Sequence, residues 1–144
     1  MNINATYTFD APRQTVWDLL VDVDAVAGCL PGLESLEPAG ENKYRAVLTM
    51  GIAAVTGRYE GTVEMQDLDP PNTYRLAVEG RGKPGFVNGG AAIALRDTGG
   101  ATEVTVEGTV KVGGTIARVG QRLLGSVSKM MMDRFFACLQ KRLG

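Results

Sequence analysis

The sequence predicts an α+β domain in which a curved, seven-stranded antiparallel sheet wraps a long C-terminal helix, with two short helices after the first strand. Two observations predict this architecture. Between residues 33 and 113 apolar and polar residues alternate with period two, interrupted by short turns. Between residues 115 and 143 there is no proline and apolar residues recur every three or four positions, which predicts one helix of about 28 residues, roughly 42 Å long. A length of 144 residues fits one domain over residues 1–144.

The individual elements follow from these patterns and from the turn residues between them. Pro12 suits the first turn of a helix, and Pro31-Gly32 ends a second helix. The segment 80–85 reads G-x-G-x-x-G, but a strand follows it and Pro84 interrupts it, so it predicts a hairpin turn and not a nucleotide site. We expect strands at about 2–10, 33–38, 42–51, 54–67, 73–83, 86–97 and 102–113, and short helices at about 12–20 and 24–29.

The charge is unevenly distributed along the chain. The net charge is −1, yet residues 115–144 carry six basic side chains against Asp133 alone, a net charge of +5. Such asymmetry can steer a protein toward anionic surfaces, although basic residues also gather near helix C-termini for local reasons. We find no basic-then-apolar leader at the N-terminus and no apolar run of membrane-spanning length, so we expect a soluble, cytoplasmic protein. In that compartment Cys29 and Cys138 are expected to be free thiols with a buried structural role.

The residue types exclude several kinds of chemistry. There is no histidine, which removes the commonest general base and metal ligand. Two distant cysteines cannot by themselves bind zinc, and the carboxylates alternate outward on strands or lie in turns. We therefore expect no catalytic residue and no metal site. Basic residues alternate with acidic ones on the strands, so nucleic-acid binding is not expected either.

The predicted architecture also suggests an internal cavity. One helix cannot fill the concave face of a curled sheet, and only 6% of the residues are aromatic. Small residues at expected inward positions, such as Gly61 and Ala91, leave further room, although such glycines can also mark bends in long strands. Tyr59 could offer a hydroxyl to a ligand carbonyl. The residues expected to line the cavity are Leu48, Met50, Tyr59, Val63, Val78, Phe86, Ile93, Val106, Val110, Leu123, Val127 and Met131.

The order of elements resembles the helix-grip fold of the START and Bet v 1-like (SRPBCC) superfamily. More narrowly, the chain resembles the carbon monoxide dehydrogenase G-subunit family over nearly its whole length. The matching positions are Ala11–Arg13, Val16-Trp17, Leu20, Asp22, Cys29–Glu37, Asp67–Pro71, Gly89–Ala91, Val112–Gly114, Ile116-Ala117 and Gly120. The resemblance places the cavity entrance at Cys29, Leu30 and Pro31, where a gate and a fixed turn are equally open interpretations.

The resemblance implies an accessory protein of a molybdenum-containing carbon monoxide dehydrogenase or a related molybdenum hydroxylase, with no covalent cofactor. We expect the cavity to take an isoprenoid quinone such as menaquinone, or a similar lipid, and to couple the enzyme to the membrane quinone pool. A recruitment or assembly factor that carries no ligand is the alternative, and a cyclase-like enzyme is a third.

The C-terminal helix suggests where a peripheral membrane contact on the inner face of the cell membrane would lie. Met132, Phe136 and Leu139 fall outside its core stripe, and Phe136 lies on the same side as Arg118, Arg122 and Lys129. Apolar groups beside basic ones suit a membrane surface, and they equally suit packing against the two short helices or against the enzyme.

Overall fold

The computed structural model of the protein describes residues 1–51 and 55–143. The expected strands and the two short helices are confirmed to within a few residues, and residue 54, where one strand was expected to begin, lies outside the described residues. The elements are β1 (Asn2–Phe9), α1 (Arg13–Leu20), α2 (Val23–Cys29), β2 (Leu33–Gly40), β3 (Lys43–Met50), β4 (Gly57–Asp69), β5 (Thr73–Gly82), β6 (Gly85–Asp97), β7 (Thr102–Gly113), the 3₁₀-helix η2 (Thr115–Val119) and α3 (Gln121–Leu143).

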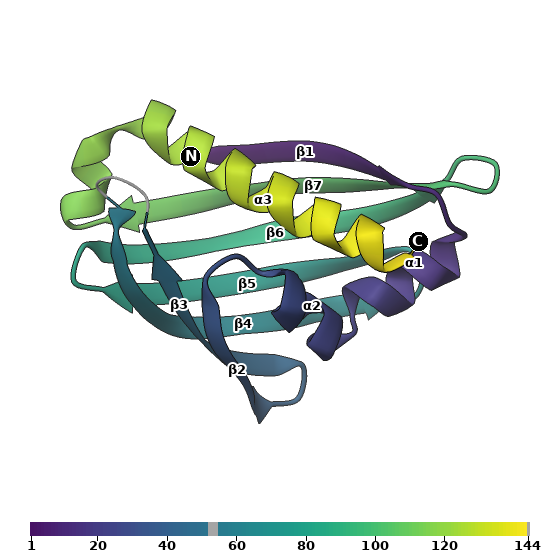
Figure 1. The fold of residues 1–144 in the computed structure, drawn as a ribbon, viewed down its shortest axis with the longest axis horizontal. Coiled ribbons are helices and arrows are strands. Elements are labelled where there is room, and N and C mark those ends of the chain that lie inside the picture. The colour runs from purple at the N-terminus through teal and green to yellow at the C-terminus, as the bar shows by residue number, and fades with distance from the viewer. Residues whose placement is uncertain (52–54, 144) are drawn as a thin grey trace.

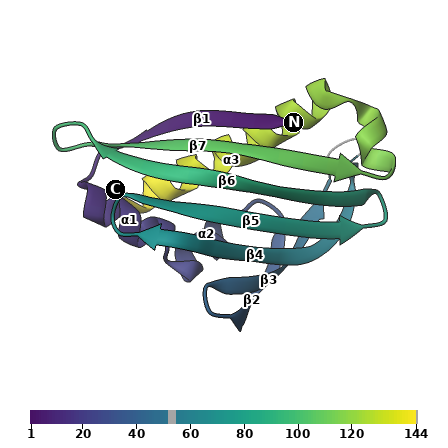
Figure 2. The ribbon, with the colours of Figure 1, turned by 180° about the vertical axis from the view of Figure 1, so that it is seen from behind.

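One antiparallel sheet contains all seven strands in the order β1-β7-β6-β5-β4-β3-β2. Strands that follow one another from β2 to β7 are neighbours, and the first strand closes against the last, so the two short helices carry the chain from one edge of the sheet to the other. The long helix α3 runs diagonally across one face (Figure 1), and the view from behind shows the other face without a helix over it (Figure 2). This is the predicted helix-grip arrangement.

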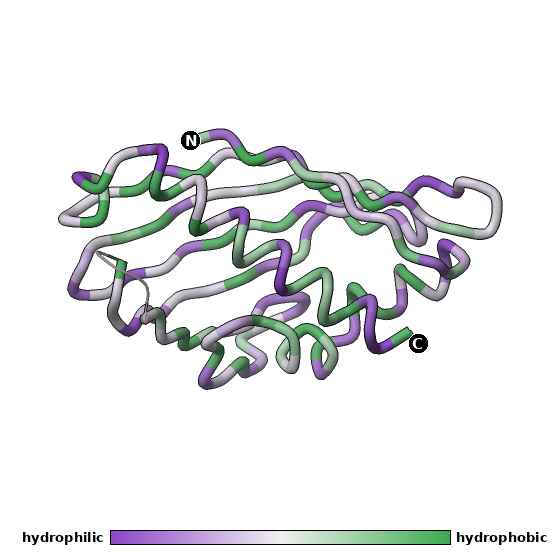
Figure 3. The backbone as a smooth tube through the Cα atoms, turned by 45° about the horizontal axis from the view of Figure 1, so that its top comes forward, coloured by the Kyte–Doolittle hydropathy of each residue, from purple (hydrophilic) through white to green (hydrophobic). Residues whose placement is uncertain are grey.

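The strand register places apolar side chains on the face that α3 covers. Val63 pairs with Val78, Val78 with Gly89, and Gly89 with Val110, so these residues form one row across four strands. Hydrophobic and hydrophilic residues alternate along the strands (Figure 3). The predicted alternation is therefore confirmed, and the face toward α3 is the apolar one.

The glycine-rich segment forms the expected hairpin turn. Gly82 pairs with Gly85, which leaves Lys83 and Pro84 as the two turn residues between β5 and β6. The Ile116 amide donates a hydrogen bond to the Pro84 carbonyl oxygen (2.8 Å), and this bond holds η2 against the hairpin.

The prediction of one continuous C-terminal helix from residue 115 is wrong. Gly120 has a φ of +89°, a left-handed conformation that interrupts the helix after η2. The α-helix proper has 23 residues, about 34 Å at the usual rise per residue. The periodicity of the side chains continues through the break, which is why the sequence pattern alone did not reveal it.

The buried apolar residues form two separate clusters at opposite ends of the sheet. The larger core joins α1, α2 and the C-terminal half of α3 to the sheet, and it contains Phe9, Trp17 and Phe136. The smaller core lies under η2 and the N-terminal half of α3, and it consists of Val55, Tyr59, Ile116 and Val127 with partly buried neighbours.

Candidate functional site

The candidate site is the stretch of apolar sheet that lies between the two cores. Val78 points the same way as Leu76 and Tyr74, which pack in or against the larger core, yet Val78 is 36% exposed in a central strand. Its row neighbours Val63 and Val110 are half-buried, and none of these three valines belongs to either cluster. The helix therefore covers this part of the concave face only incompletely, and an apolar ligand could bind there.

The predicted cavity residues divide into three groups around this gap. Ile93 and Val106 are buried in the larger core, which makes them structural side chains at its boundary. Met50, Tyr59, Leu123, Val127 and Met131 belong to the smaller core or pack against it. Leu48, Val63, Val78 and Val110 belong to neither cluster and form the floor of the gap, in which Val78 is exposed and the other three are half-buried.

The prediction that Phe86 lines the cavity is wrong. Val87 packs against the smaller core, and adjacent strand residues point to opposite faces, so Phe86 points to the outer face of the sheet. It pairs there with Gly113 and Arg81 and is 47% exposed. Moving the predicted start of this strand by one residue would not change the face on which Phe86 lies. The prediction selected Phe86 because it is hydrophobic.

Tyr59 has its hydroxyl occupied inside the protein. The hydroxyl donates a hydrogen bond to the Val55 carbonyl oxygen (2.8 Å), and burial raises the pKa of Tyr59. The expected donation to a ligand carbonyl would therefore require this bond to break. In the present arrangement Tyr59 closes one end of the gap.

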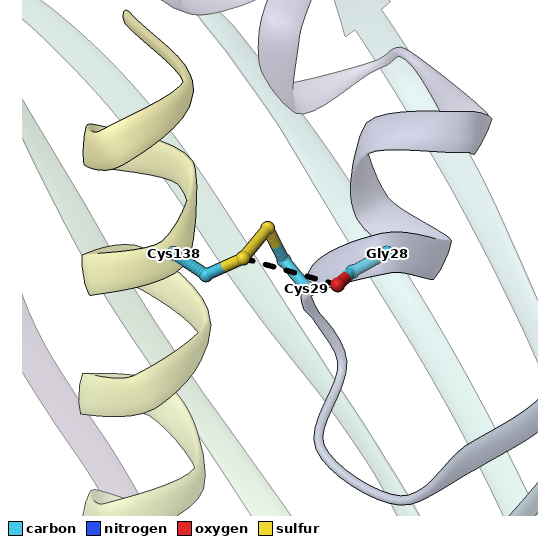
Figure 4. Close-up of a disulfide and its surroundings, with 3 residues drawn as sticks. All are labelled: Gly28, Cys29 and Cys138. Carbon is cyan, nitrogen blue, oxygen red and sulfur yellow. Dashed lines mark hydrogen bonds between the residues drawn. A yellow bond between two sulfur atoms is a disulfide. The ribbon is translucent and has the colours of Figure 1, made fainter. Parts of the chain in front are cut away.

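Cys29 and Cys138 form a disulfide, so the expectation of free thiols is wrong. Their Cα atoms lie 5.5 Å apart although 109 positions separate them (Figure 4). The packing of α2 beside α3 brings them together, and neither spacing nor composition encodes that contact. The buried position expected for Cys29 is confirmed, because the residue is 5% exposed.

The predicted entrance segment is held at both ends in this structure. Cys29 is cross-linked at its start, and at its end the Gly32 carbonyl accepts a hydrogen bond from the Thr49 amide (2.8 Å). Leu30 and Pro31 lie between these anchors and are half-buried. With the disulfide formed, this geometry is that of the fixed turn, one of the two interpretations that the sequence left open.

The helix residues predicted to contact a membrane or a partner are not all available. Phe136 is 5% exposed and stacks on Tyr7 with ring centroids 4.1 Å apart, and Met132 packs against the larger core. The prediction is wrong for Phe136, because β1 occupies the face of the helix that the wheel had left open. Arg118, Arg122 and Lys129 are exposed, as expected.

A polar network attaches α3 to the edge strand β1. The Tyr7 hydroxyl donates to Asp133 Oδ1 (2.8 Å), and Lys129 Nζ lies 2.8 Å from Asp133 Oδ2. Hydrogen bonds from Lys129 and Tyr7 lower the pKa of Asp133, while burial and the neighbouring carboxylate raise the pKa of Tyr7. A groove of about 330 Å³ between β1 and α3 borders this network.

A second groove, of about 530 Å³, lies beside the β5–β6 hairpin. Arg58, Arg81 and Lys83 line it, and Arg58 is paired with Glu34 (3.0 Å) and Glu60 (3.6 Å). Within residues 1–51 and 55–143, Arg81 and Lys83 have no ion-pair partner. Sequence reasoning missed this basic end; the run Arg81-Gly-Lys83 in a predicted hairpin was the signal that could have found it.

The described part of the chain contains no cluster of three or more histidine, cysteine or carboxylate side chains that could hold a metal ion. In the same residues, no helix is long and apolar enough to cross a membrane. The candidate site thus offers a ligand an apolar surface. The titratable groups with shifted pKa values lie outside the valine row, and they are Tyr7, Asp133, Tyr59, Tyr74 and Glu34.

A curved seven-stranded sheet, a long C-terminal helix and an incompletely covered apolar face between them define a helix-grip protein. The family model for the G subunit of carbon monoxide dehydrogenase (CoxG) matches residues 6–144. The chain therefore belongs to this family.

Solved structures agree with this assignment of the fold. A conserved protein from Geobacillus kaustophilus is 40% identical, with a TM-score of 0.96 over 99% of this chain and 94% of that one. A protein from Thermus thermophilus is 18% identical (TM-score 0.71, covering 99% and 96%). The Zhui aromatase/cyclase from Streptomyces sp. R1128 is 15% identical (TM-score 0.68, covering 99% and 92%) and shares the fold alone. Among curated proteins, no sequence matches significantly.

Proposed function

We propose that the protein binds an isoprenoid quinone, such as menaquinone, between α3 and the sheet and couples a carbon monoxide dehydrogenase to the membrane quinone pool. Membership of the CoxG family supports the accessory role at such an enzyme. The observation that supports binding of an apolar ligand is the apolar floor around the exposed Val78, which α3 leaves uncovered between the two cores.

The composition of the floor suits an isoprenoid chain. Its side chains are aliphatic, and Gly89 lies in the same row as Val63, Val78 and Val110, so a flexible hydrocarbon could lie against the sheet without meeting a large residue. Burial of ten methylene-sized groups would supply roughly 8 kcal/mol of gross transfer free energy. Part of that is offset by the loss of ligand freedom, and the remainder is enough for useful affinity.

The floor gives little support to a cyclase-like enzyme. Along the row, no acid or base accompanies the valines, and the carboxylates on these strands, such as Glu64 and Glu79, alternate with the inward residues. General acid–base chemistry needs such a group within hydrogen-bond reach of the reacting atoms. The likeness to the Zhui aromatase/cyclase is one of fold and does not supply it.

The basic end at the β5–β6 hairpin is the better candidate for peripheral membrane contact. Arg81 pairs with Phe86, whose ring is 47% exposed, and Lys83 lies in the turn between the two strands. The Ile116–Pro84 hydrogen bond holds η2, which carries the exposed Arg118, against this hairpin. An exposed aromatic ring among cations suits an anionic lipid surface. Co-sedimentation with phosphatidylglycerol vesicles should weaken at least fivefold in the double variant Lys83→Glu/Phe86→Ser. It should stay unchanged in the control variant Lys141→Glu, which replaces an exposed lysine at the opposite end of the molecule.

The quinone proposal is tested with a matched pair of tryptophan variants. Val78→Trp fills the floor, whereas Glu79→Trp adds the same side chain one residue further on, on the opposite face. Organic extraction and native mass spectrometry of the purified protein, with added menaquinone and ubiquinone, should detect bound quinone. We expect Val78→Trp to weaken binding at least tenfold and Glu79→Trp to leave it within twofold.

A wild-type protein that is folded but takes up neither quinone would overturn this proposal. The docking factor that carries no ligand would then be the better account. That role predicts that the dehydrogenase co-elutes with the Val78→Trp protein as well as with the wild type.

A further inference from the structure

The disulfide lies where it can control the approach to the candidate site. Cys29 is the last residue of α2, and the entrance segment, residues 30–32, follows it directly. Cys138 belongs to α3, the helix that covers the sheet (Figure 4). One covalent bond therefore ties the beginning of the entrance segment to the lid of the gap.

Apart from this bond, few side chains attach the C-terminal end of α2 to the rest of the protein. The helix has seven residues, and its buried side chains are Ala25 and Cys29. Its N-terminal end is capped by Asp22, whose Oδ1 accepts hydrogen bonds from the amides of Asp24 (3.1 Å) and Ala25 (3.4 Å). Few buried contacts mean that a segment opens at low free energy, so the last turn of α2 depends on the disulfide, while the Thr49–Gly32 hydrogen bond holds the far end of the segment.

We propose that Cys29 and Cys138 form a thiol–disulfide exchange site whose disulfide latches the entrance segment and whose reduction releases it. The mobility of α2 and residues 30–32 follows from the contacts alone. The consequence for ligand exchange rests on the proposed quinone function. No compartment needs to be assumed, because a dithiol reductant and a small disulfide such as oxidised glutathione define the two states.

The exchange chemistry has a preferred direction of attack. Cys29 is 5% exposed, whereas Cys138 is only half-buried, so an incoming dithiol attacks the Cys138 sulfur as its thiolate. The sulfur–sulfur bond breaks, a mixed disulfide forms on Cys138, and Cys29 leaves as a thiolate that takes up a proton. The second thiol of the reagent then displaces Cys138, so the reagent becomes a cyclic disulfide and both cysteines become thiols.

Closure reverses these steps. The Cys138 thiolate attacks oxidised glutathione and releases one glutathione thiolate, and the Cys29 thiolate then attacks the Cys138 sulfur and releases the second. The Arg142 guanidinium occupies the space where a Cβ on residue 28, the chain neighbour of Cys29, would lie. Positive charge favours thiolate chemistry.

The open state keeps one weak contact. In the disulfide, the Cys138 sulfur carries no proton and lies 3.9 Å from the Gly28 carbonyl oxygen (Figure 4). After reduction, the same sulfur is a thiol that can donate to this carbonyl. A covalent restraint is thereby exchanged for a weak one, which loosens α2 without detaching it.

The latch is tested first without any ligand, by amide hydrogen exchange of the whole protein with and without dithiothreitol. We expect reduction to speed exchange at least tenfold in residues 26–32 and less than twofold in α1, which the larger core holds. Cys29→Ser/Cys138→Ser should exchange rapidly in this segment under both conditions. Equal protection of residues 26–32 in the oxidised and reduced wild type would overturn the proposal.

The order of attack is tested with single variants. Oxidised glutathione should modify Cys138 in Cys29→Ser at least tenfold faster than it modifies Cys29 in Cys138→Ser, as followed by intact mass. Equal rates would overturn the assigned direction of exchange.

The role in ligand exchange is tested by the release rate of bound menaquinone in the two redox states. We expect reduction to raise the release rate at least tenfold. If menaquinone binds and leaves equally fast in both states, the latch does not control the site. A protein that loosens residues 26–32 on reduction yet binds no quinone would keep the latch and contradict the quinone proposal alone, so the two failures are distinguishable.

Discussion

The two ends of the sheet differ in how completely they are closed. At one end the larger core joins three helices to the sheet, with Phe9 and Val16 fully buried and Phe136 stacked on Tyr7. At the other end four buried residues form the smaller core under η2, and the β5–β6 hairpin carries Arg81, Lys83 and the exposed Phe86. The comparison indicates that the larger core contributes more to the stability of the fold than the smaller one, and that the apolar face between the two cores stays partly uncovered at Val78.

The largest effect should come from truncating the centre of the larger core. Phe136→Ala should lower the free energy of unfolding by about 3–5 kcal/mol, because the cavity it leaves is lined by rings that cannot collapse into it. Val127→Ala, in the smaller core, should cost about 2 kcal/mol. Urea unfolding followed by circular dichroism measures both. A larger loss of unfolding free energy in Val127→Ala than in Phe136→Ala would contradict the proposal that the larger core contributes more to stability.

Removal of the disulfide should cause the second-largest loss of unfolding free energy. Cys29→Ala/Cys138→Ala frees a loop of 109 residues in the unfolded chain, and we expect a loss of about 2–4 kcal/mol. The wild type unfolded with and without a reductant is the direct control, since no side chain changes there. Identical unfolding midpoints in those two conditions would show that α2 is held by other contacts.

A buried hydrogen bond at the closed end should have a smaller effect. The Thr102 side chain is 0% exposed and donates to the Ala11 carbonyl oxygen (2.8 Å). Thr102→Val keeps the shape and leaves that carbonyl unpaired, so we expect a loss of about 1–3 kcal/mol. The exposed Thr109 on the same strand provides the control, because Thr109→Val should stay within about 0.5 kcal/mol. Equal effects of the two variants would argue against the importance of this bond.

The floor of the gap should tolerate change. Val78→Ala should alter the free energy of unfolding by less than about 0.5 kcal/mol, because the side chain is already 36% exposed. Val104→Ala, the same substitution at a residue that is 0% exposed on the same face, should cost about 2 kcal/mol. Similar losses in thermal and urea unfolding would mean that Val78 is core and that the gap is closed in solution.

The smallest effect concerns the acid side of the stability profile. Lys129 and Tyr7 lower the pKa of Asp133 below its ordinary value of 3.8, so the unfolded chain binds this proton more tightly than the folded one. The stabilisation is therefore present above that value and is lost as the pH falls through the lowered pKa. Asp133→Asn should flatten the acid loss in urea titrations at a series of pH values. An unchanged acid slope would contradict a role for this network in holding α3 on β1.

The sequence predicted the order and the bounds of nearly all elements, because period-two alternation and turn residues act locally. It also indicated which side chains of β4 and β7 face inward. The sequence-based prediction was wrong at Gly120, because the helical spacing of apolar residues continues through a break in the backbone. It was also wrong at Phe86, because the hydrophobic side chain suggested burial although its position in the strand places it on the exposed face. Phe136 failed for a third reason: a helical wheel shows the faces of one helix and cannot show that β1 covers a second face.

Local patterning by itself thus determined the seven strands, the two short helices, the absence of histidine chemistry and the apolar character of one sheet face. Only the tertiary structure decided which part of that face stays uncovered, that Cys29 meets Cys138 across 109 positions, and that Phe86, beside Arg81, is exposed while Phe136 is buried. The physical reason is that sequence patterns carry information only about residues that are close along the chain. Periodicity reports the neighbours of a residue along the chain, whereas coverage, cross-linking and exposure depend on where α3 crosses the sheet.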